Sequence, residues 1–225
     1  MRPYAQYCPI AKAAEVLGDR WSLLIVREMV SGSHRFNELA RGLPGISRAL
    51  LSKRLQQLQR VGVIASSKQG YELTPAGEEL KPLIFGLAEW GAKWAFAEPM
   101  PEELDPDLLL WWIHRGIDPD QRPDKRVVIE FEFSDHDHRF WLVVEPDDVS
   151  VCVTPPGIET DVLVSSTLPT MYRVWLGREE LYDAMRDDRV RLSGTPSMVR
   201  ALPRWLEFSP VAGYVREARD PVPTQ

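Results

Sequence analysis

Apolar residues recur at helical spacing in the first part of the chain and follow strand-like patterns in much of the second. Helical spacing predicts five helices in the first part, at residues 9–17, 21–30, 35–41, 47–61 and 75–95. Two short extended pieces, residues 63–68 and 71–73, are joined around Gln69-Gly70. They indicate a β-hairpin directly after the fourth helix.

The second part of the chain mixes strands with helices. Strands are predicted at residues 125–133, 139–146, 149–155, 160–166 and 189–194. Helices are predicted at residues 107–116, 168–177, 178–188 and 195–208. The predicted fold class is therefore α+β, with an antiparallel or mixed sheet in the second part.

The fourth predicted helix carries no acidic residue. Ser47 suits its N-cap, and Leu51, Leu55 and Leu58 form its apolar face. Its polar residues are all basic, amide or hydroxyl, and include Arg48, Ser52, Lys53, Gln56 and Arg60. A solvated face usually mixes both signs of charge, whereas a carboxylate in the major groove of DNA would repel phosphate. The pattern therefore favours a recognition helix.

The net charge changes sign along the chain. Residues 1–97 hold 13 Lys and Arg against 8 Asp and Glu, a net charge of +5, and residues 98–225 hold 14 against 25, a net charge of −11. Only the positively charged first part would favour binding to a polyanion such as a nucleic acid. The change coincides with a segment rich in proline and acids, so we expect one domain at residues 1–97, a linker at 98–106 and a second domain at 107–225.

Several classes of protein are disfavoured. The chain has no run of about 18 apolar residues, and its first residues lack the apolar core of a secretion signal, so we expect a cytoplasmic protein with no membrane partner. Cys8 and Cys152 are too few and too far apart in sequence for a disulfide framework or a zinc site. His136 and His138 lie among acids in a predicted exposed turn. We expect no metal and no cofactor.

Three stretches occur in the order found in a known family. They are YCPIAKAAEVLGDRWSLLIVREM, RFNELARGLPGISRALLSKRLQQLQRVGVI and YELTPAGEELKPLIFGLAEWG. Together they make residues 7–95 resemble the HxlR-type winged helix-turn-helix transcriptional regulators. The resemblance implies a homodimer, held by the first helix and the helix at 75–95, that binds an inverted-repeat operator in double-stranded DNA.

Two sets of residues follow for this part of the chain. The candidate DNA-binding residues are Arg35, Ser47, Arg48, Ser52, Lys53, Gln56, Ser67 and Lys68, with Ser66 also in the hairpin. The candidate dimer residues recur at 3-4 spacing along one seam and are Leu80, Leu83, Leu87, Trp90 and Trp94. Arg54 lies closer to the leucine face. We therefore expect it to pack or to form a salt bridge in preference to contacting DNA.

Residues 105–208 resemble the sterol-carrier-protein-type domain. The resemblance is carried by LPTMYRVWLGREELYDAMRDDRVRLSGTPSMVRALPRWL and implies an apolar pocket for a hydrophobic small-molecule effector. The candidate pocket residues are Trp111, Trp141, Met171 and Trp175. Each of them equally suits the plain core of a small α+β domain.

Other functions are left open by the residues. Cys8 precedes a helix start, where a thiol can have a lowered pKa, and HxlR-type relatives include redox sensors, so a regulator that senses through Cys8 is one alternative. A second alternative is an enzyme or carrier that acts on a lipid-like ligand. A third is a protein-interaction module. No G-x-S-x-G elbow or phosphate loop supports an enzyme, and we expect a non-enzymatic protein.

Overall fold

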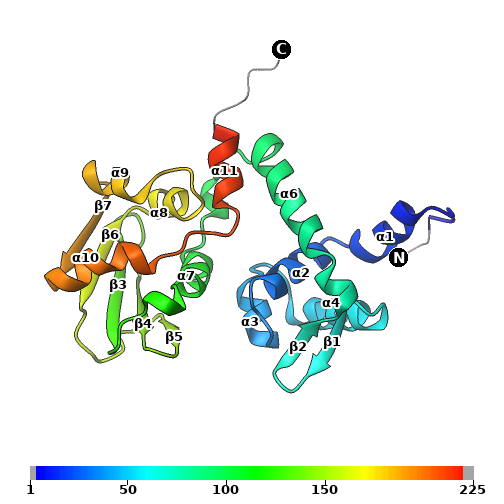
Figure 1. The fold of residues 1–225 in the computed structure, drawn as a ribbon, viewed down its shortest axis with the longest axis horizontal. Helices are drawn as coiled ribbons and strands as arrows, with labels where there is room; N and C mark the ends of the chain where they lie inside the picture. The colour runs from blue at the N-terminus through cyan, green and yellow to red at the C-terminus, as the bar shows by residue number, and fades with distance from the viewer. Residues whose placement is uncertain (1–3, 220–225) are drawn as a thin grey trace, which may run out of the picture. The chain divides into compact units, whose positions relative to one another are not determined.

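The computed structural model describes residues 4–219. The chain divides into two compact units, and the division falls between Ala88 and Glu89, inside a helix and upstream of the linker predicted at residues 98–106. Figure 1 shows the helices and strands of both units, and each unit has its own hydrophobic core.

The first unit is a winged helix-turn-helix, as predicted. It contains, in order, α1 (Pro9–Leu17), α2 (Ser22–Val30), α3 (Phe36–Arg41), α4 (Arg48–Arg60), β1 (Ile64–Ser67), β2 (Gly70–Leu73), α5 (Pro75–Glu78) and the start of α6 (Lys81–Trp94). β1 and β2 pair antiparallel, with Ile64 opposite Leu73 and Ser67 opposite Gly70. The core is formed by α2, α3, α4, β1 and α6, with Leu39 and Ile84 among its buried residues.

The sequence predicts helix over residues 75–95 but leaves open whether Pro82 kinks that helix or restarts it. Thr74 caps α5 by accepting a hydrogen bond from the N–H of Gly77, but α5 ends at Glu78 and α6 begins at Lys81. Pro82 lies in the first turn of α6, where its missing N–H has no helical partner to lose. The proline therefore marks a restart of the helix and not a kink within it.

The second unit is built on a five-stranded mixed sheet. The strands are β3 (Val127–Phe133), β4 (Arg139–Val144), β5 (Val149–Cys152), β6 (Val162–Ser166) and β7 (Val190–Gly194), in the order β5-β4-β3-β6-β7. β3 and β6 are parallel, and the other neighbours are antiparallel. All five strands were predicted, and of the two sheet types that the sequence left open, antiparallel and mixed, the sheet is mixed.

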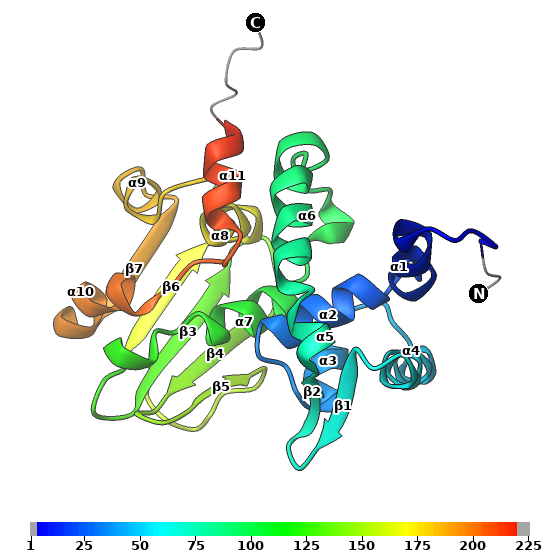
Figure 2. The ribbon, with the colours of Figure 1, turned by 45° about the vertical axis from the view of Figure 1, so that its right-hand side comes forward.

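Helices cover one face of this sheet. They are α7 (Pro106–Arg115), α8 (Leu168–Trp175), α9 (Leu181–Arg186) and α10 (Pro196–Trp205), and all four contribute buried residues to the same core as alternate residues of the strands. Three further elements were not predicted: η1 (Pro101–Glu103), η2 (Pro119–Gln121) and α11 (Ala212–Arg219). Figure 2 shows the helices packed against the strands.

The opposite face of the sheet has a separate small cluster of Val128, Trp141 and Val143, with Cys152 packed against it. The connection between β5 and β6 must pass β4 and β3 to reach its place in the sheet. Its last residues touch this face: the Thr160 hydroxyl donates to Glu130 at 2.8 Å, and Asp161 accepts from the N–H of Val128 at 2.9 Å. These contacts fix where the connection ends and β6 begins.

A set of polar contacts joins the segment after α6 to the loop after α8. The Arg178 guanidinium donates to the backbone oxygens of Phe96 and Ala97, the latter at 2.8 Å, and to the Glu98 carboxylate at 2.9 Å. It also lies 4.4 Å from the centroid of the Phe96 ring, and Arg173 bonds to Glu98 at 2.6 Å. We call this set of residues the Arg178 clasp. The chain entering the predicted linker is therefore held against the second unit.

A helix must be long and apolar to cross a membrane. Within residues 4–219, none of the helices combines the length and the apolar content that a membrane span requires.

Gly194, the last residue of β7, supports a stability prediction. Its φ of +132° is a backbone conformation that side chains rarely adopt, and an added Cβ would lie 2.2 Å from the backbone oxygen of Asp161. We expect Gly194→Ala to lower the free energy of unfolding of the second unit by about 1–3 kcal/mol. Urea titrations followed by tryptophan fluorescence would measure it.

Gly157→Ala is the matched control. Gly157 also has a positive φ, +73°, but an added Cβ would meet no heavy atom within 4 Å. The control should lose less stability than Gly194→Ala, and equal losses would contradict the explanation by close approach.

Candidate nucleic-acid interface

The rotation of α4 about its axis is set at its N-terminus and along its leucine stripe. The Ser47 hydroxyl accepts from the N–H of Leu50 at 3.2 Å, which confirms the predicted N-cap. Leu51, Leu55 and Leu58 are fully buried in the core of the first unit. The side of α4 opposite the leucines must therefore point away from that core.

Among the candidate contacts on α4, Lys53 and Gln56 point to this outward side, and Arg48 and Ser52 lie on its flank, nearer the leucine stripe. Arg48, Lys53 and Gln56 are exposed, and Ser52 is partly exposed. Figure 2 shows α4 nearly end-on beside the β1–β2 hairpin. Arg60, also exposed, bonds through its Nε to the backbone oxygen of Gln56 at 3.3 Å. The structure thus brings the predicted basic and amide side chains onto one accessible surface.

The hairpin is anchored to α4 and to the turn before α3. Gln59 donates to the hydroxyl of Ser66 at 2.7 Å. This bond links α4 to the β1–β2 hairpin, which is the wing of the winged helix-turn-helix. The N–H of Tyr71 donates to the backbone oxygen of His34 at 2.8 Å, and the Tyr71 oxygen lies 3.1 Å from His34 Nδ1. These contacts hold the wing in place. Gln59 was missed as a contributing residue because its amide looked like one more solvated side chain.

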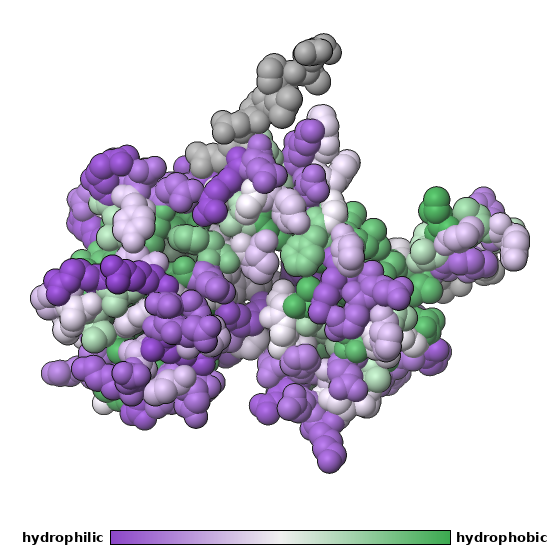
Figure 3. Space-filling view, viewed as in Figure 1, coloured by the Kyte–Doolittle hydropathy of each residue, from purple (hydrophilic) through white to green (hydrophobic). Residues whose placement is uncertain are grey.

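The wing residues are open to a partner. Lys68 is exposed and Ser67 is partly exposed, and the tip of the hairpin is hydrophilic (Figure 3). Ser67 accepts from the N–H of Gln69 at 3.2 Å, so its hydroxyl helps shape the turn. Lys68 is therefore an exposed cation in the turn between β1 and β2.

Arg35 and Glu38 shape the start of α3. Arg35 is the exposed N-cap residue, and the backbone N–H groups of Arg35 and His34 both donate to Glu38 Oε2, at 2.8 and 2.9 Å. Burial alone would raise the pKa of Glu38, but these N–H donors and the charge of Arg35 outweigh it and hold the pKa below the ordinary 4.5. The ionised carboxylate therefore caps the first helix of the helix-turn-helix.

A buried carboxylate holds the turn between α3 and α4. Glu28 is 1% exposed, and its carboxylate accepts from Arg27 Nη2 at 2.8 Å and from the Ser33 hydroxyl at 3.3 Å. Arg27 Nη2 also donates to the backbone oxygen of Gly42 at 3.0 Å. A Cβ at residue 42 would lie 1.9 Å from the Glu28 carboxylate, so a larger residue there would displace that carboxylate. Glu28 is not among the residues predicted from the sequence, although an acid between the apolar Ile25 and Met29 of α2 signals a buried polar contact.

Arg54 forms the salt bridge predicted for it. Its guanidinium bonds to Asp19, in the loop before α2, and to Gln57 at 2.6 Å. This prediction is confirmed. The contact ties the middle of α4 to the loop between α1 and α2, and it removes Arg54 from the surface that DNA could reach.

The candidate dimer residues form an exposed apolar stripe along α6. The exposed fractions are 45% for Leu83, 43% for Leu87, 60% for Trp90 and 65% for Trp94. Leu80 precedes α6 and differs from them because it packs against the core of the first unit. Hydrophobic surface is visible over α6 and at α1 in the space-filling view (Figure 3).

Cys8 is a free, partly exposed thiol at the N-cap of α1, and its side chain forms no capping hydrogen bond. On α1 itself, Ile10 is 80% exposed. This exposed apolar side chain at the start of α1 is, like the stripe on α6, a surface that a second chain could cover.

The four candidate pocket residues do not lie together. Met171 and Trp175 are buried in the main core of the second unit, and Trp111 is buried on α7. Trp141 belongs to the separate cluster on the opposite face of the sheet. A strand side chain alternates between faces, and the sequence pattern alone did not show which face Trp141 takes.

A hollow on the second unit lies away from these four residues. It has a volume of about 440 Å³, near the ends of β3, β6 and β7, and its lining includes Ser134, Ser165, Thr170, Arg189 and Arg191. These polar side chains would suit a polar occupant.

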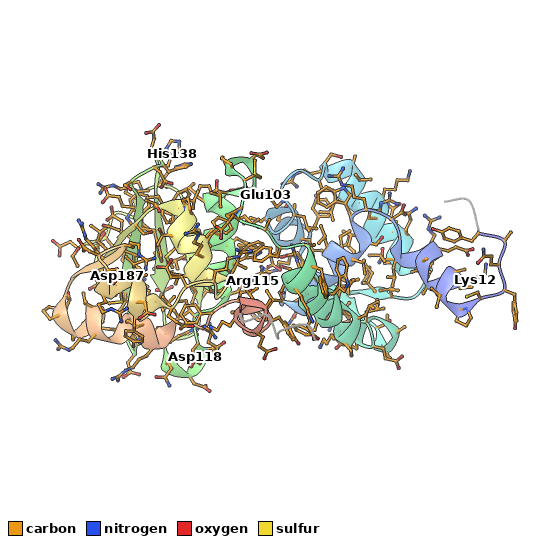
Figure 4. All side chains as sticks on the ribbon, turned by 90° about the horizontal axis from the view of Figure 1, so that it is seen from above. Lys12, Glu103, Arg115, Asp118, His138 and Asp187 are labelled. Atoms are coloured by element: carbon orange, nitrogen blue, oxygen red, sulfur yellow. The ribbon has the colours of Figure 1, made fainter. Side chains whose placement is uncertain are left out.

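The two histidines that lie among acids in the sequence are close together at one turn. His138 lies at the exposed turn between β3 and β4 (Figure 4), and its N–H donates to His136 Nδ1 at 3.3 Å. Between residues 4 and 219, no group of three or more His, Cys, Asp or Glu residues has an arrangement that could hold a metal ion.

Comparisons with known proteins agree with the geometry of the first unit. Residues 16–99 match the family described as HxlR-like helix-turn-helix. The uncharacterized HTH-type transcriptional regulator YvaP of Bacillus subtilis is 34% identical over 113 residues, which cover 47% of this chain and 96% of YvaP.

Two solved structures show partial likeness. The quinone-bound YodB from B. subtilis is 29% identical, with a TM-score of 0.36, and the match covers 39% of this chain and 99% of YodB. A stereoselective inverting sec-alkylsulfatase from Pseudomonas sp. is 20% identical, with a TM-score of 0.41, over 88% of this chain and 29% of the sulfatase. Similarity at these TM-scores assigns no activity to this chain.

The cap formed by Glu38 predicts a pH dependence of stability. Because the pKa of Glu38 is lowered in the folded chain, its stabilising contribution is complete above the ordinary carboxyl pKa of 4.5 and is lost as the pH falls through the lowered value. Glu38→Gln should therefore be less stable than the wild type near neutral pH. The difference should shrink below about pH 4. Urea unfolding across this range measures it, and a difference that is the same at every pH would refute the assignment.

Proposed function

Because the chain belongs to the HxlR-like helix-turn-helix family, we propose that it is a transcriptional regulator that binds operator DNA through α4 and the β1–β2 hairpin. The observation that carries the proposal is the exposed, acid-free face of α4 opposite three buried leucines. Side chains of this kind read base edges in the major groove, which is wide enough to admit a helix.

The candidate residues divide into two kinds of contact. Arg48, Ser52, Lys53 and Gln56 lie on α4, where a recognition helix meets base edges and nearby phosphates. Arg35, Ser67 and Lys68 flank that helix and suit phosphate contacts that set its register on the duplex. The Ser47 cap holds the N-terminus of α4, whose N–H groups and dipole favour a phosphate.

We expect Lys53→Glu to weaken operator binding at least tenfold, because it removes a cation and places an anion against DNA phosphate. Glu102→Lys, an exposed change of the opposite sign in the second unit, is the control and should have a much smaller effect. Fluorescence anisotropy with DNA selected from a random pool, measured at several salt concentrations, gives both affinities. Equal effects of the two substitutions, or an affinity independent of salt, would refute the assignment of α4.

The proposal includes a homodimer that binds an inverted repeat. Four exposed apolar side chains along one stripe of α6 support it, because such a stripe costs free energy in water and is stabilised by a partner helix. A second copy of this chain offers the same stripe, and a two-fold dimer would present two α4 helices to successive turns of the major groove.

Leu87→Ala together with Trp90→Ala should yield a monomer in sedimentation velocity, because the two changes remove apolar area from the centre of the stripe. Tyr182→Ala is the control, since Tyr182 is exposed but lies on α9 of the second unit. The control should leave the dimer unchanged. A dimer that survives the double substitution would place the interface on another surface.

We also propose that the second unit senses a small molecule and changes the affinity of the regulator for DNA. Two observations support this part: the acidic second unit suits no nucleic acid, and the Arg178 clasp ties it to the segment that leaves α6. The sterol-carrier resemblance favours an apolar effector, whereas the polar hollow near β7 favours a polar one. An effector can act only through the difference in its affinity for the DNA-competent and incompetent forms.

Native mass spectrometry of the purified protein tests this part directly. A retained small molecule, whose removal changes operator affinity, would support sensing. Turnover of such a molecule would favour the enzyme or carrier alternative. Identical operator affinity with and without cell-extracted small molecules would indicate an interaction module, and a response to oxidants that Cys8→Ser abolishes would indicate redox sensing.

A further inference from the structure

The first residue of α4 is already engaged by α3. Arg48 Nη1 donates to Asn37 Oδ1 at 3.0 Å, and the Arg48 guanidinium carbon lies 5.7 Å from the centroid of the Phe36 ring. Arg48 and Asn37 are both exposed, while Phe36 is partly buried against the core of the first unit. The Asn37 amide therefore holds one edge of the Arg48 guanidinium. The guanidinium also lies near the Phe36 ring, which packs against the core of the first unit.

The remaining edge of the guanidinium is open. A guanidinium has five N–H donors in a planar fork, and the bond to Asn37 uses one of them. Across residues 4–219, Arg48 makes no other hydrogen bond or ion pair. Its Nη2 and Nε donors can form two parallel bonds to one partner, which is the arrangement that arginine uses with the O6 and N7 acceptors of guanine.

We propose that Asn37 is a positioning residue that aims the Arg48 guanidinium at a guanine in the major groove, and so sets base specificity from a helix that does not itself read the base. The inference rests on the proposed DNA-binding function of α4. A long side chain that is free in solution loses rotamer entropy when it binds, and a side chain held in advance loses less. The hydrogen bond to Asn37 thereby favours the base that can accept two bonds over bases that accept one.

The charge of the orienting group matters in this arrangement. An aspartate at residue 37 would accept the same hydrogen bond from Arg48 but would add a negative charge close to DNA phosphate. An alanine would remove the acceptor without adding charge. The two substitutions therefore separate orientation of Arg48 from general attraction to DNA.

The experiment uses the full chain and DNA selected from a random pool, followed by dissociation constants for duplexes with each base changed in turn. Arg48→Ala should reduce the preference for guanine at one position of each half-site by roughly tenfold. Asn37→Ala should reduce the preference several-fold at the same position. Asn37→Asp should keep the preference and weaken binding to every sequence.

A double-mutant cycle provides the decisive measurement. In the Arg48→Ala protein, adding Asn37→Ala should change the preference no further, because the residue that Asn37 orients is absent. Additive effects, or a loss of preference at a different position, would mean that Asn37 contacts DNA itself and would overturn the inference.

Two controls separate this inference from the function on which it rests. Circular dichroism melting should be the same for all variants, because both side chains are exposed. Failure of the wild-type chain to select any sequence would overturn the DNA-binding function and this inference with it. Selection of a sequence by the wild type, with additive effects of the two substitutions, overturns the role of Asn37 alone.

Discussion

The burial of Leu51, Leu55 and Leu58 determines what every other residue of α4 can do. All three side chains are fully buried, and burying each stabilises the fold by about 1.5–3 kcal/mol relative to exposure. Turning α4 by a quarter of a turn would expose this stripe and bury charged groups, which is far more costly. The direction in which Arg48, Lys53 and Gln56 point is therefore a consequence of the apolar core, and the surface offered to DNA follows from it.

Polar contacts then fix the parts that the apolar core leaves free. Glu28 and Arg27 hold the turn before α4, Glu38 caps α3, and Gln59 ties the wing to the recognition helix. Buried or partly buried polar groups require their partners, because an unsatisfied donor or acceptor costs about 1–3 kcal/mol. Contacts of this kind keep helix, turn and wing in one relative position, which recognition of a rigid duplex requires.

The second unit follows different rules. Its sheet buries one face under four helices and closes a small cluster on the other, and its surface carries most of the acidic residues of the chain. Those charges oppose association with DNA and leave the positively charged first unit to form that contact. The Arg178 clasp holds the residues that follow the candidate dimer helix against the loop after α8.

The sequence by itself determined the elements and the face of α4. The period of the leucines, the Ser47 cap and the absence of acids are local properties, and helix geometry converts them directly into a surface. The strands of the second unit followed from alternation in the same way. The position of Arg54 near the leucine stripe was also enough to predict that it packs or forms a salt bridge, and it forms a salt bridge with Asp19.

Only the tertiary structure decided which distant residues meet. The hydrogen bond between Asn37 and Arg48 joins α3 to α4. A turn connects these two helices, and the sequence pattern does not encode the angle between the helices. Trp141 was grouped with Met171 and Trp175, but a strand residue faces one side or the other according to the register of its neighbours. Periodicity assigns a residue to a face of its own element, whereas packing between elements decides what that face touches.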